Sequence, residues 1–377
     1  MSEIRTIGVL TSGGDCAGLN AAIRSVTYAA IQNYGWTVYG ILDGTMGLIN
    51  RPVQYRELRL STFSGTQLRE GGTFLGTTNK GDPFNFLMPD GSHKDRSEEF
   101  AEGCRALNLD ALVVIGGDGS MRIVSKLCAR AGIGMVGIPK TIDNDVHGTE
   151  YAIGFSTATN VVTEALDRLQ PTAASHHRVM ILEVMGRDAG HIAMNAGIAG
   201  GADVILVPEI PYSLDGVARK IRTVLAQGRT HALVVVAEGC RTEGGEKAVI
   251  SYAGGEQRYG GIGHYLTDKI AQMTGAETRV TILGHVQRGG TPSMRDRLIA
   301  SAFGVHAVEL VAQRKFGHMV GWLDRGVIDV PMAEVTIGAR ALDPLGTLTH
   351  TARRLGIYVG DLPEEPAAAE PAAAPGV

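Results

Sequence analysis

Short apolar runs alternate along the chain with longer segments in which apolar residues recur at helical spacing. Each run is bounded by glycine or polar residues, which is typical of strands buried on both faces of a parallel sheet. Because strands and helices alternate, the pattern predicts an α/β fold with right-handed crossovers. We expect strands at residues 7–10, 38–42, 112–115, 135–138, 179–184, 204–207 and 233–237, and helices at residues 19–31, 120–131, 157–169, 214–225, 262–273 and 297–311.

Length and composition narrow this picture to two globular domains. The chain has 377 residues, which favours two domains of roughly 150–200 residues each. It is 44% hydrophobic and 20% charged, as in globular proteins, and its 51 glycines indicate many tight turns. Residues 363–377 mix proline, alanine and glutamate without an apolar face, so they are expected to form a disordered tail.

The charge and the cysteines exclude several classes of protein. A net charge of −4 argues against binding to nucleic acid or to an anionic membrane, although a local basic cluster could still hold a phosphorylated small molecule. The four cysteines are scattered, without metal-ligand or disulfide spacing, and indicate reduced thiols. We find neither a signal peptide nor a membrane span in the sequence and expect a cytoplasmic protein.

Two glycine-rich turns follow expected strands. Gly13-Gly14-Asp15 comes after the first strand, and Gly117-Asp118 comes after the strand at 112–115. Glycine lets backbone amides approach a phosphate, and an aspartate beside them suits Mg²⁺ that carries a nucleotide. The alternatives are a tight turn without a ligand and, at Asp118, the start of a helix.

An acidic cluster follows the strand that ends at residue 138. Asp143 and Asp145 lie two residues apart, so in extended backbone both would point to the same side. Repulsion between the two carboxylates would raise the proton affinity of one, which is how a general base is tuned. The alternative is a turn rich in aspartate and asparagine, which would account well for Asn144.

Basic residues recur beside glycine or at the ends of strand-like runs. Arginines there can clamp a phosphate with two hydrogen bonds, although an isolated arginine is more often a solvated surface charge. Arg178 and Arg187 flank the expected strand at 179–184, and Arg288 follows a strand-like run at 278–283 that contains Arg279. The sequence has neither a P-loop nor a dinucleotide-binding fingerprint, which argues against a nicotinamide-dependent dehydrogenase.

Taken in order, these motifs resemble the 6-phosphofructokinase family of the bacterial type, and the similarity covers residues 4 to about 360. The resemblance implies two mostly parallel, helix-flanked sheet domains. The motifs are Leu-Thr-Ser-Gly-Gly-Asp at 10–15, Gly-Gly-Thr-Phe-Leu-Gly at 71–76, Gly-Gly-Asp-Gly-Ser at 116–120, Thr-Ile-Asp-Asn-Asp at 141–145, Glu-Val-Met-Gly-Arg at 183–187, Ala-Glu-Gly at 237–239 and Leu-Gly-His-Val-Gln-Arg-Gly-Gly at 283–290.

Carried over position by position, the resemblance implies a kinase that transfers phosphate from ATP-Mg to fructose 6-phosphate in glycolysis. Asp143 would be the general base for the 1-hydroxyl, with Thr141, Asp145 and Arg187 at the reacting centre. The remaining positions that match the sugar-phosphate site are Ile142, Arg178, Met185, Gly186, Glu238, Arg279, His285, Val286, Gln287 and Arg288.

The resemblance also implies a donor site in which Asp118 carries Mg²⁺. Asn79 stands where the family usually has an arginine, and Lys80 is expected to substitute for it in part, as a point charge. The nucleotide positions are Gly14, Asn79, Lys80, Gly117, Asp118, Gly119 and Ser120.

Two residues bear on the identity of the phosphoryl donor. Gly119 is similar to the ATP-using branch, since an aspartate there would block the α-phosphate. Lys140 is similar to the pyrophosphate-using branch, and the pair also occurs in ATP-dependent members related to that branch. We favour ATP, with a pyrophosphate-dependent enzyme as the alternative. A non-catalytic sugar-phosphate-binding protein could dispense with Asp143 and Arg187, and both are present.

The resemblance implies two domains that each draw on separate parts of the chain. A nucleotide-binding and Mg²⁺-binding domain would comprise residues 1–154 and about 287–337, and a fructose 6-phosphate-binding domain residues 155–286 and about 338–360. In this family Arg178 and Arg279 usually come from a neighbouring subunit, so a dimer or tetramer is expected.

Overall fold

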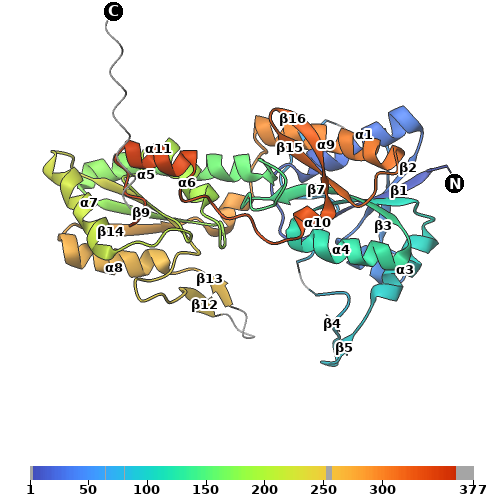
Figure 1. Ribbon diagram of the computed structural model, residues 1–377, viewed down its shortest axis with the longest axis horizontal. Coiled ribbons are helices and arrows are strands. Elements are labelled where there is room, and N and C mark those ends of the chain that lie inside the picture. Colours follow the sequence, from blue (N-terminus) through green and yellow to red (C-terminus); the bar gives the residue numbers. More distant parts are fainter. Residues whose placement is uncertain (1–2, 64, 80, 252–256, 362–377) are drawn as a thin grey trace, which may run out of the picture.

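The chain forms two lobes that lie side by side, each built around one sheet (Figure 1). The computed structural model describes residues 3–63, 65–79, 81–251 and 257–361. The expected tail at 363–377 and Lys80 lie outside the described residues. Among the described helices, none is long and apolar enough to span a membrane.

The first lobe contains an eight-stranded sheet that is parallel in its centre. Its order is β16-β15-β7-β6-β1-β2-β3, with β8 beside β7, and the edge pairs β2-β3 and β15-β16 are antiparallel. The sequence pattern did not predict these antiparallel edges. The strands are β1 (Thr6–Thr11), β2 (Thr37–Ile41), β3 (Tyr55–Leu58), β6 (Ala111–Gly116), β7 (Gly134–Thr141), β8 (Ile153–Gly154), β15 (His318–Leu323) and β16 (Gly326–Pro331).

Helices cover both faces of this sheet, which explains its uninterrupted apolar strands. Along β6, Val113 and Ile115 belong to the core on one face, whereas Leu112 and Val114 belong to the core on the other. Helices α1 and α9 cover the first of these faces and α3 and α4 the second (Figure 1). The helices of this lobe are α1 (Leu19–Tyr34), α2 (Met46–Ile49), α3 (Ser97–Ala106), α4 (Asp118–Ala131), α9 (Met294–Ala312) and α10 (Met332–Val335).

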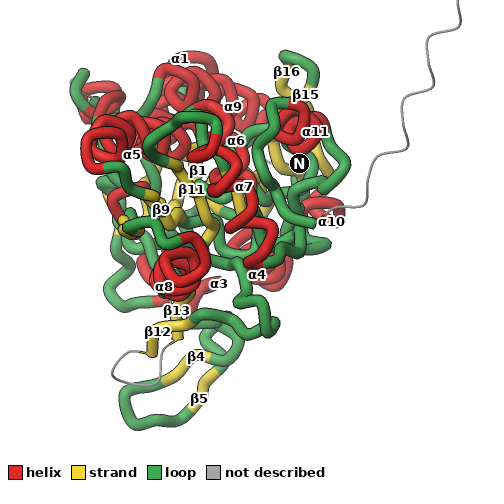
Figure 2. The backbone as a smooth tube through the Cα atoms, turned by 90° about the vertical axis from the view of Figure 1, so that its left-hand side faces the viewer, coloured by secondary structure: helices red, strands yellow, loops and turns green. Residues whose placement is uncertain are grey.

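The second lobe contains a four-stranded, fully parallel sheet in the order β10-β11-β9-β14. Its strands lie between α5 and α6 on one side and α8 on the other (Figure 2). The strands are β9 (Val179–Val184), β10 (Val204–Leu206), β11 (Ala232–Ala237) and β14 (Thr278–Ile282), and the helices are α5 (Phe155–His176), α6 (His191–Ala199), α7 (Leu214–Ala226), α8 (Ile262–Thr274) and α11 (Thr347–Arg354).

The chain passes between the lobes three times. It enters the second lobe through α5, returns after the 3₁₀ helix η3 (Gly284–Arg288) to form α9, β15 and β16, and leaves again after α10 to reach α11. Outside the two sheets are the short pairs β4 (Phe86–Leu87) with β5 (His93–Lys94) and β12 (Val249–Ser251) with β13 (Gln257–Tyr259), and the 3₁₀ helices η1 (Leu60–Thr62) and η2 (Gln67–Arg69).

Candidate active site

Three turns meet at the carboxyl ends of strands in the large sheet, because β1, β6 and β7 are parallel neighbours. Gly13 has a φ of +86°, and a Cβ atom there would lie 3.2 Å from the Ser120 Oγ and 3.3 Å from the Lys140 Nζ. The Ser12 amide donates to the Ile115 carbonyl at 3.0 Å. The two glycine turns and the end of β7 therefore lie close together.

The acidic loop leaves β7 later than expected and bends where extended backbone was predicted. β7 continues to Thr141, and Asn144 has a φ of +53°, so the premise that extended backbone aligns Asp143 and Asp145 is wrong. The reversal at Asn144 is fixed by its side chain, which donates to the Glu150 carbonyl at 2.9 Å and accepts from the Ala152 amide at 2.8 Å. The turn and the charged site therefore coexist.

Asp143 is a buried carboxyl group whose proton affinity is strongly altered. It is 5% exposed, and its Oδ1 is buried with no hydrogen-bond partner among the described residues. Burial, together with the negative charge of Asp145, raises the pKa of Asp143 to about 7, while Arg288 and Arg187 act in the opposite direction. A carboxyl group of this kind can accept a proton near neutral pH.

Asp118 and Asp145 form a second pair of carboxylates. Burial raises the pKa of Asp145, and the negative charge of Asp118 raises it further. Helix α4 begins at Asp118. Its N-cap residue is Gly117, and no side chain makes a capping hydrogen bond to the start of the helix. No group of three or more His, Cys, Asp or Glu side chains in the described ranges could hold a metal ion. Two carboxylates fit Mg²⁺, which takes its other ligands from phosphates and water.

The loop after β9 brings Arg187 toward the site from the second lobe. Arg187 has a φ of +52°, and its amide donates to the Glu238 Oε1 at 3.2 Å. A Cβ atom on Gly239 would lie only 1.8 Å from the Arg187 carbonyl oxygen. Glycine is therefore needed at 239 because the backbone of the Arg187 loop comes so close.

Helix η3 connects the loops of the two lobes. The Gln287 side chain accepts a hydrogen bond from the Met185 amide at 2.8 Å, and Arg288 Nη1 donates to the Asp15 carbonyl at 3.0 Å. A Cβ atom on Gly14 would lie 2.8 Å from the same Arg288 nitrogen. Through Arg288 and Gln287, helix η3 thus links the first glycine turn to the loop that carries Arg187.

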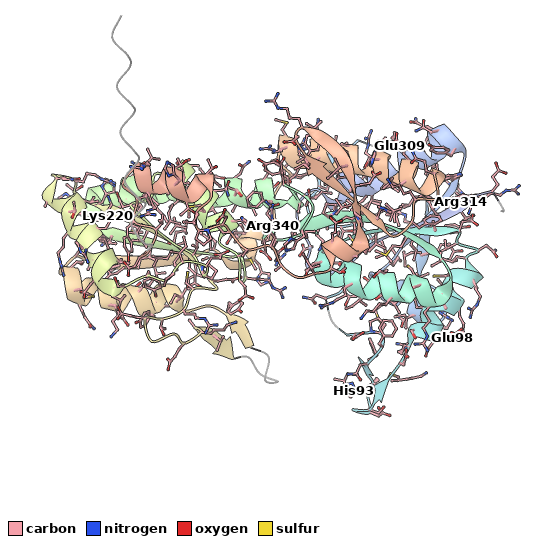
Figure 3. All side chains as sticks on the ribbon, in the orientation of Figure 1. His93, Glu98, Lys220, Glu309, Arg314 and Arg340 are labelled. Carbon is pink, nitrogen blue, oxygen red and sulfur yellow. The ribbon has the colours of Figure 1, made fainter. Side chains whose placement is uncertain are left out.

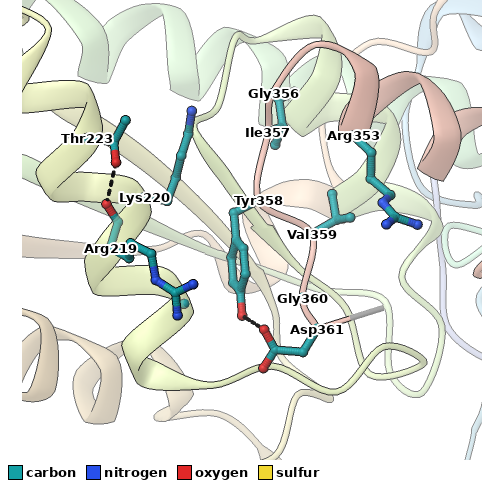
Figure 4. A pocket seen from close by; sticks show the side chains of 11 residues that line it. Arg219, Lys220, Thr223, Arg353, Gly356, Ile357, Tyr358, Val359, Gly360 and Asp361 are labelled. Carbon is teal, nitrogen blue, oxygen red and sulfur yellow. Dashed lines mark hydrogen bonds between the residues drawn. The ribbon is translucent and has the colours of Figure 1, made fainter. Parts of the chain in front are cut away.

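A cavity of about 450 Å³ opens beside the first glycine turn. It is lined by Asp15, Asn20, Glu70, Gly71, Gly72, Thr73, Phe74, Gly76 and Thr77. A second cavity, of about 330 Å³, lies between α7 and residues 353–361 (Figure 4). None of the predicted site residues lines this second cavity, where the Tyr358 hydroxyl donates to Asp361 at 2.7 Å.

Comparison with known proteins identifies the family of this chain. The sequence model described as "Phosphofructokinase" matches residues 6–311. A protein of Synechocystis named "ATP-dependent 6-phosphofructokinase 1" is 57% identical over 96% of this chain and 100% of its own length. The chain belongs to the phosphofructokinase family. A Nostoc protein of the same name is 56% identical over the same shares of both chains.

Solved structures of phosphofructokinases share the fold. The Saccharomyces cerevisiae phosphofructokinase has a TM-score of 0.74 and 31% identity, covering 88% of this chain and 45% of that chain. The pyrophosphate-dependent phosphofructokinase of Nitrosospira multiformis has a TM-score of 0.78, covers 96% and 94% of the two chains and, at 20% identity, shows the fold alone. The prediction of two mostly parallel, helix-flanked sheet domains is confirmed.

Apart from Asn79 and Lys80, the predicted site residues fall into two groups. One group lies where strand ends, loops and the starts of helices meet between the lobes: Gly14, Gly117, Asp118, Gly119, Ser120, Lys140, Thr141, Ile142, Asp143, Asp145, Met185, Gly186, Arg187, Glu238, His285, Val286, Gln287 and Arg288. Arg178 and Arg279 form the other group, at the amino ends of β9 and β14, where both pair with Glu277 at 2.9 and 2.5 Å. Because the strands are parallel, these two arginines lie at the amino ends of the strands, whereas Arg187 follows the carboxyl end of β9.

Two residues at the donor side, Thr73 and Thr77, were not selected from the sequence, whereas Asn79 was. Asn79 is exposed beside the first glycine turn, and the carbonyl of its neighbour Thr78 accepts from the Gly13 amide at 2.9 Å. Thr73 and Thr77 line the adjacent cavity. The motif at 71–76 pointed to this segment, but only the fold shows that it packs against the turn at Gly13.

Proposed function

We propose that this protein phosphorylates the 1-hydroxyl of fructose 6-phosphate with ATP-Mg, giving fructose 1,6-bisphosphate and ADP. The observation that carries the proposal is Asp143, a buried carboxyl group with a pKa near 7 where charged loops from both lobes meet. The relatives from Synechocystis and Nostoc, which match along almost the whole chain, are both named as ATP-dependent 6-phosphofructokinases.

In the proposed reaction Asp143 removes the proton of the 1-hydroxyl as the oxygen attacks the γ-phosphorus. The pKa of Asp143, near 7, makes its ionised form available at neutral pH. Arg187 and Arg288 are close enough to influence the charge of Asp143, so each can also attract a phosphoryl group beside it. We assign Arg187 to the transferred phosphoryl group and Arg288 to the sugar phosphate.

The rest of the sugar-phosphate site is assigned to the loops around Arg187 and η3. The Glu238 side chain accepts a hydrogen bond from the Arg187 amide, and the Gln287 side chain accepts one from the Met185 amide. Both residues therefore fix the Arg187 loop in addition to their assigned place in the site. Thr141 accepts from the Asp143 amide at 3.1 Å and hydrogen-bonds Asp145, which fixes the acidic loop. The remaining assigned residues are Ile142, Gly186, His285 and Val286.

Mg²⁺ is assigned to Asp118, with Asp145 nearby, and would neutralise charge on the donor phosphates. The glycine turns at Gly14 and Gly117 leave room for those phosphates, with Ser120 adjacent. Asn79 and Lys80 are assigned to the nucleotide. A nucleotide donor is supported by Gly119, because a Cβ atom there would meet no atom within 4 Å. An aspartate at 119 would occupy this open space.

The assignment of domains follows the two sheets. Residues 1–154 with about 287–337 would bind the nucleotide and Mg²⁺, and residues 155–286 with about 338–360 would bind fructose 6-phosphate. Arg178 and Arg279 lie away from Arg187 in their own chain, which supports their contribution to the site of a neighbouring subunit. We therefore propose a homo-oligomer. We also propose that it works in the cytoplasm, without membrane or nucleic-acid partners.

The test is a donor comparison on the purified protein. Formation of fructose 1,6-bisphosphate from fructose 6-phosphate and Mg²⁺ is followed through a coupled assay with ATP and, separately, with pyrophosphate. Turnover with ATP that exceeds turnover with pyrophosphate by at least about tenfold is expected. The reverse preference would overturn the choice of donor, and no turnover with either donor would overturn the proposed activity.

A further inference from the structure

The segment that carries the chain from α10 to α11 crosses between the two lobes (Figure 1). Arg340 lies on this segment, and in Figure 3 it is labelled midway between the lobes. The proposed reaction assigns it no role, and the motifs in the sequence did not select it. Its contacts nevertheless lead directly to the acidic loop.

Arg340 is hydrogen-bonded to the backbone of two residues beside Asp143. Its amide donates to the Asp145 carbonyl at 2.6 Å, and its Nη2 donates to the Asn144 carbonyl at 2.9 Å. Asn144 is the residue at which the loop reverses in the left-handed region. Arg340 therefore holds the loop at its bend.

The same segment is also attached to the second lobe beside the Arg187 loop. The Arg340 carbonyl accepts from the Nε2 of His191, the first residue of α6, at 3.1 Å. Two residues later the Leu342 amide donates to the Glu209 carboxylate at 2.7 Å, and this carboxylate also accepts from the Gly190 amide at 2.9 and 3.1 Å. Gly190 and His191 directly follow the loop of Arg187.

The hydrogen-bonding capacity of the Arg340 side chain is only partly used. Its Nε is buried and has no hydrogen-bond partner among the described residues. A buried donor without a partner is unfavourable, and an arginine placed only for stability would be expected to satisfy it. The arrangement is better explained by the bond that the same guanidinium makes to the acidic loop.

We propose that Arg340 is a positioning residue that sets the acidic loop of Asp143 relative to the Arg187 loop. This inference rests on the proposed function, because it assumes that phosphoryl transfer requires Asp143 and Arg187 together. A shift of about 1 Å in a reacting group can lower the rate about 100-fold, and loops from different lobes need a connection to keep their spacing. Arg340 supplies that connection without touching the substrate.

The test compares Arg340→Met, Arg340→Lys and the control Arg222→Met in the full-length protein. The Arg222 guanidinium also donates a hydrogen bond to a backbone carbonyl, that of Met273, at 2.6 Å. Arg222 lies, however, on the exposed side of α7. Steady-state kinetics with fructose 6-phosphate and ATP should show kcat about 10–100-fold lower for Arg340→Met. KM for fructose 6-phosphate should change less than about threefold, and Arg340→Lys should recover most of the lost kcat.

Melting temperatures separate positioning from a general loss of stability. Arg340→Met and Arg222→Met should lower Tm by similar amounts, while only Arg340→Met lowers kcat. A kcat within about twofold of the unsubstituted protein, or an equal loss in both variants, overturns the inference. If Arg340→Met does not fold, His191→Phe removes the other side-chain bond to Arg340 and must show the same loss of kcat.

The unsubstituted protein distinguishes this inference from the function on which it rests. If it does not convert fructose 6-phosphate with ATP or pyrophosphate, the proposed function fails and the inference fails with it. If it is active and Arg340→Met is equally active, the proposed function stands and only the role of Arg340 is wrong.

Discussion

The ammonium group of Lys140 lies 2.5 Å from the carbonyl oxygen of Gly14 and donates a hydrogen bond to it. Lys140 is 3% exposed, and burial lowers its pKa. The lysine at the end of β7 therefore supports the glycine turn after β1 from inside the protein. We therefore propose that donor choice depends chiefly on the space at Gly119, where a side chain would enter the open part of the site.

Gly119→Asp should lower kcat/KM for ATP by at least about 100-fold. An aspartate would project into space that is now empty and would repel the α-phosphate of the nucleotide. Gly119→Ala is the matched control, because a lone Cβ meets no atom within 4 Å and should leave ATP turnover within about threefold. Equal losses in the two variants would show that backbone freedom, and not space, matters at 119.

The rate should depend on pH through Asp143. Because the proposed base is the ionised carboxylate, kcat/KM for fructose 6-phosphate should rise with pH and reach half its maximum near the pKa of Asp143, about 7. Asp143→Ser should lower kcat by about 10²–10⁴-fold with a much smaller change in KM. A pH profile that is flat from pH 6 to pH 8 would contradict this assignment.

The same buried carboxyl group should limit stability at neutral and alkaline pH. Burial raises the pKa of Asp143 from 3.8 to about 7. The contribution that protonated Asp143 makes to folding stability is therefore fully present below pH 3.8 and is lost as the pH rises through about 7. Asp143→Asn should therefore raise Tm by an amount that grows between about pH 4 and pH 7 and is constant above pH 7. Asp167→Asn, on the exposed side of α5, should leave Tm unchanged at every pH.

The sequence predicted the centres of both sheets because their strands are buried on two faces. It missed the edge strands β3 and β16, whose residues are mostly exposed or half-buried and so give no continuous apolar run. A turn at Asn144 was given from the sequence only as an alternative, and the bonds to Glu150 and Ala152 that fix it could not be predicted locally. Arg340 lies almost 200 positions from Asn144, and no motif connects the two.

The separation of Arg178 and Arg279 from Arg187 predicts a site shared between subunits. Asp143→Ser and Arg279→Ala should each be nearly inactive alone, whereas co-expression of the two chains should restore activity. A hybrid dimer has one site with both Asp143 and a neighbour's Arg279, so random mixing should give about a quarter of full activity. Simple addition of the two residual activities would show that each site is built from one chain.

Gly239→Ala should lower activity without unfolding the protein. A methyl group at 239 would lie 1.8 Å from the Arg187 carbonyl oxygen, so the Arg187 loop would have to move away from Glu238. The amide of Arg187 would then lose its bond to Glu238, and kcat/KM for fructose 6-phosphate should fall about 10–100-fold.

Gly244→Ala, five residues further on, is a suitable control because its nearest neighbour, the Thr242 Oγ1, is 3.8 Å away. If both variants keep full activity, the close approach at Gly239 does not position Arg187. A fall confined to Gly239→Ala, with circular dichroism unchanged, would show that the backbone at 239 sets the place of the arginine.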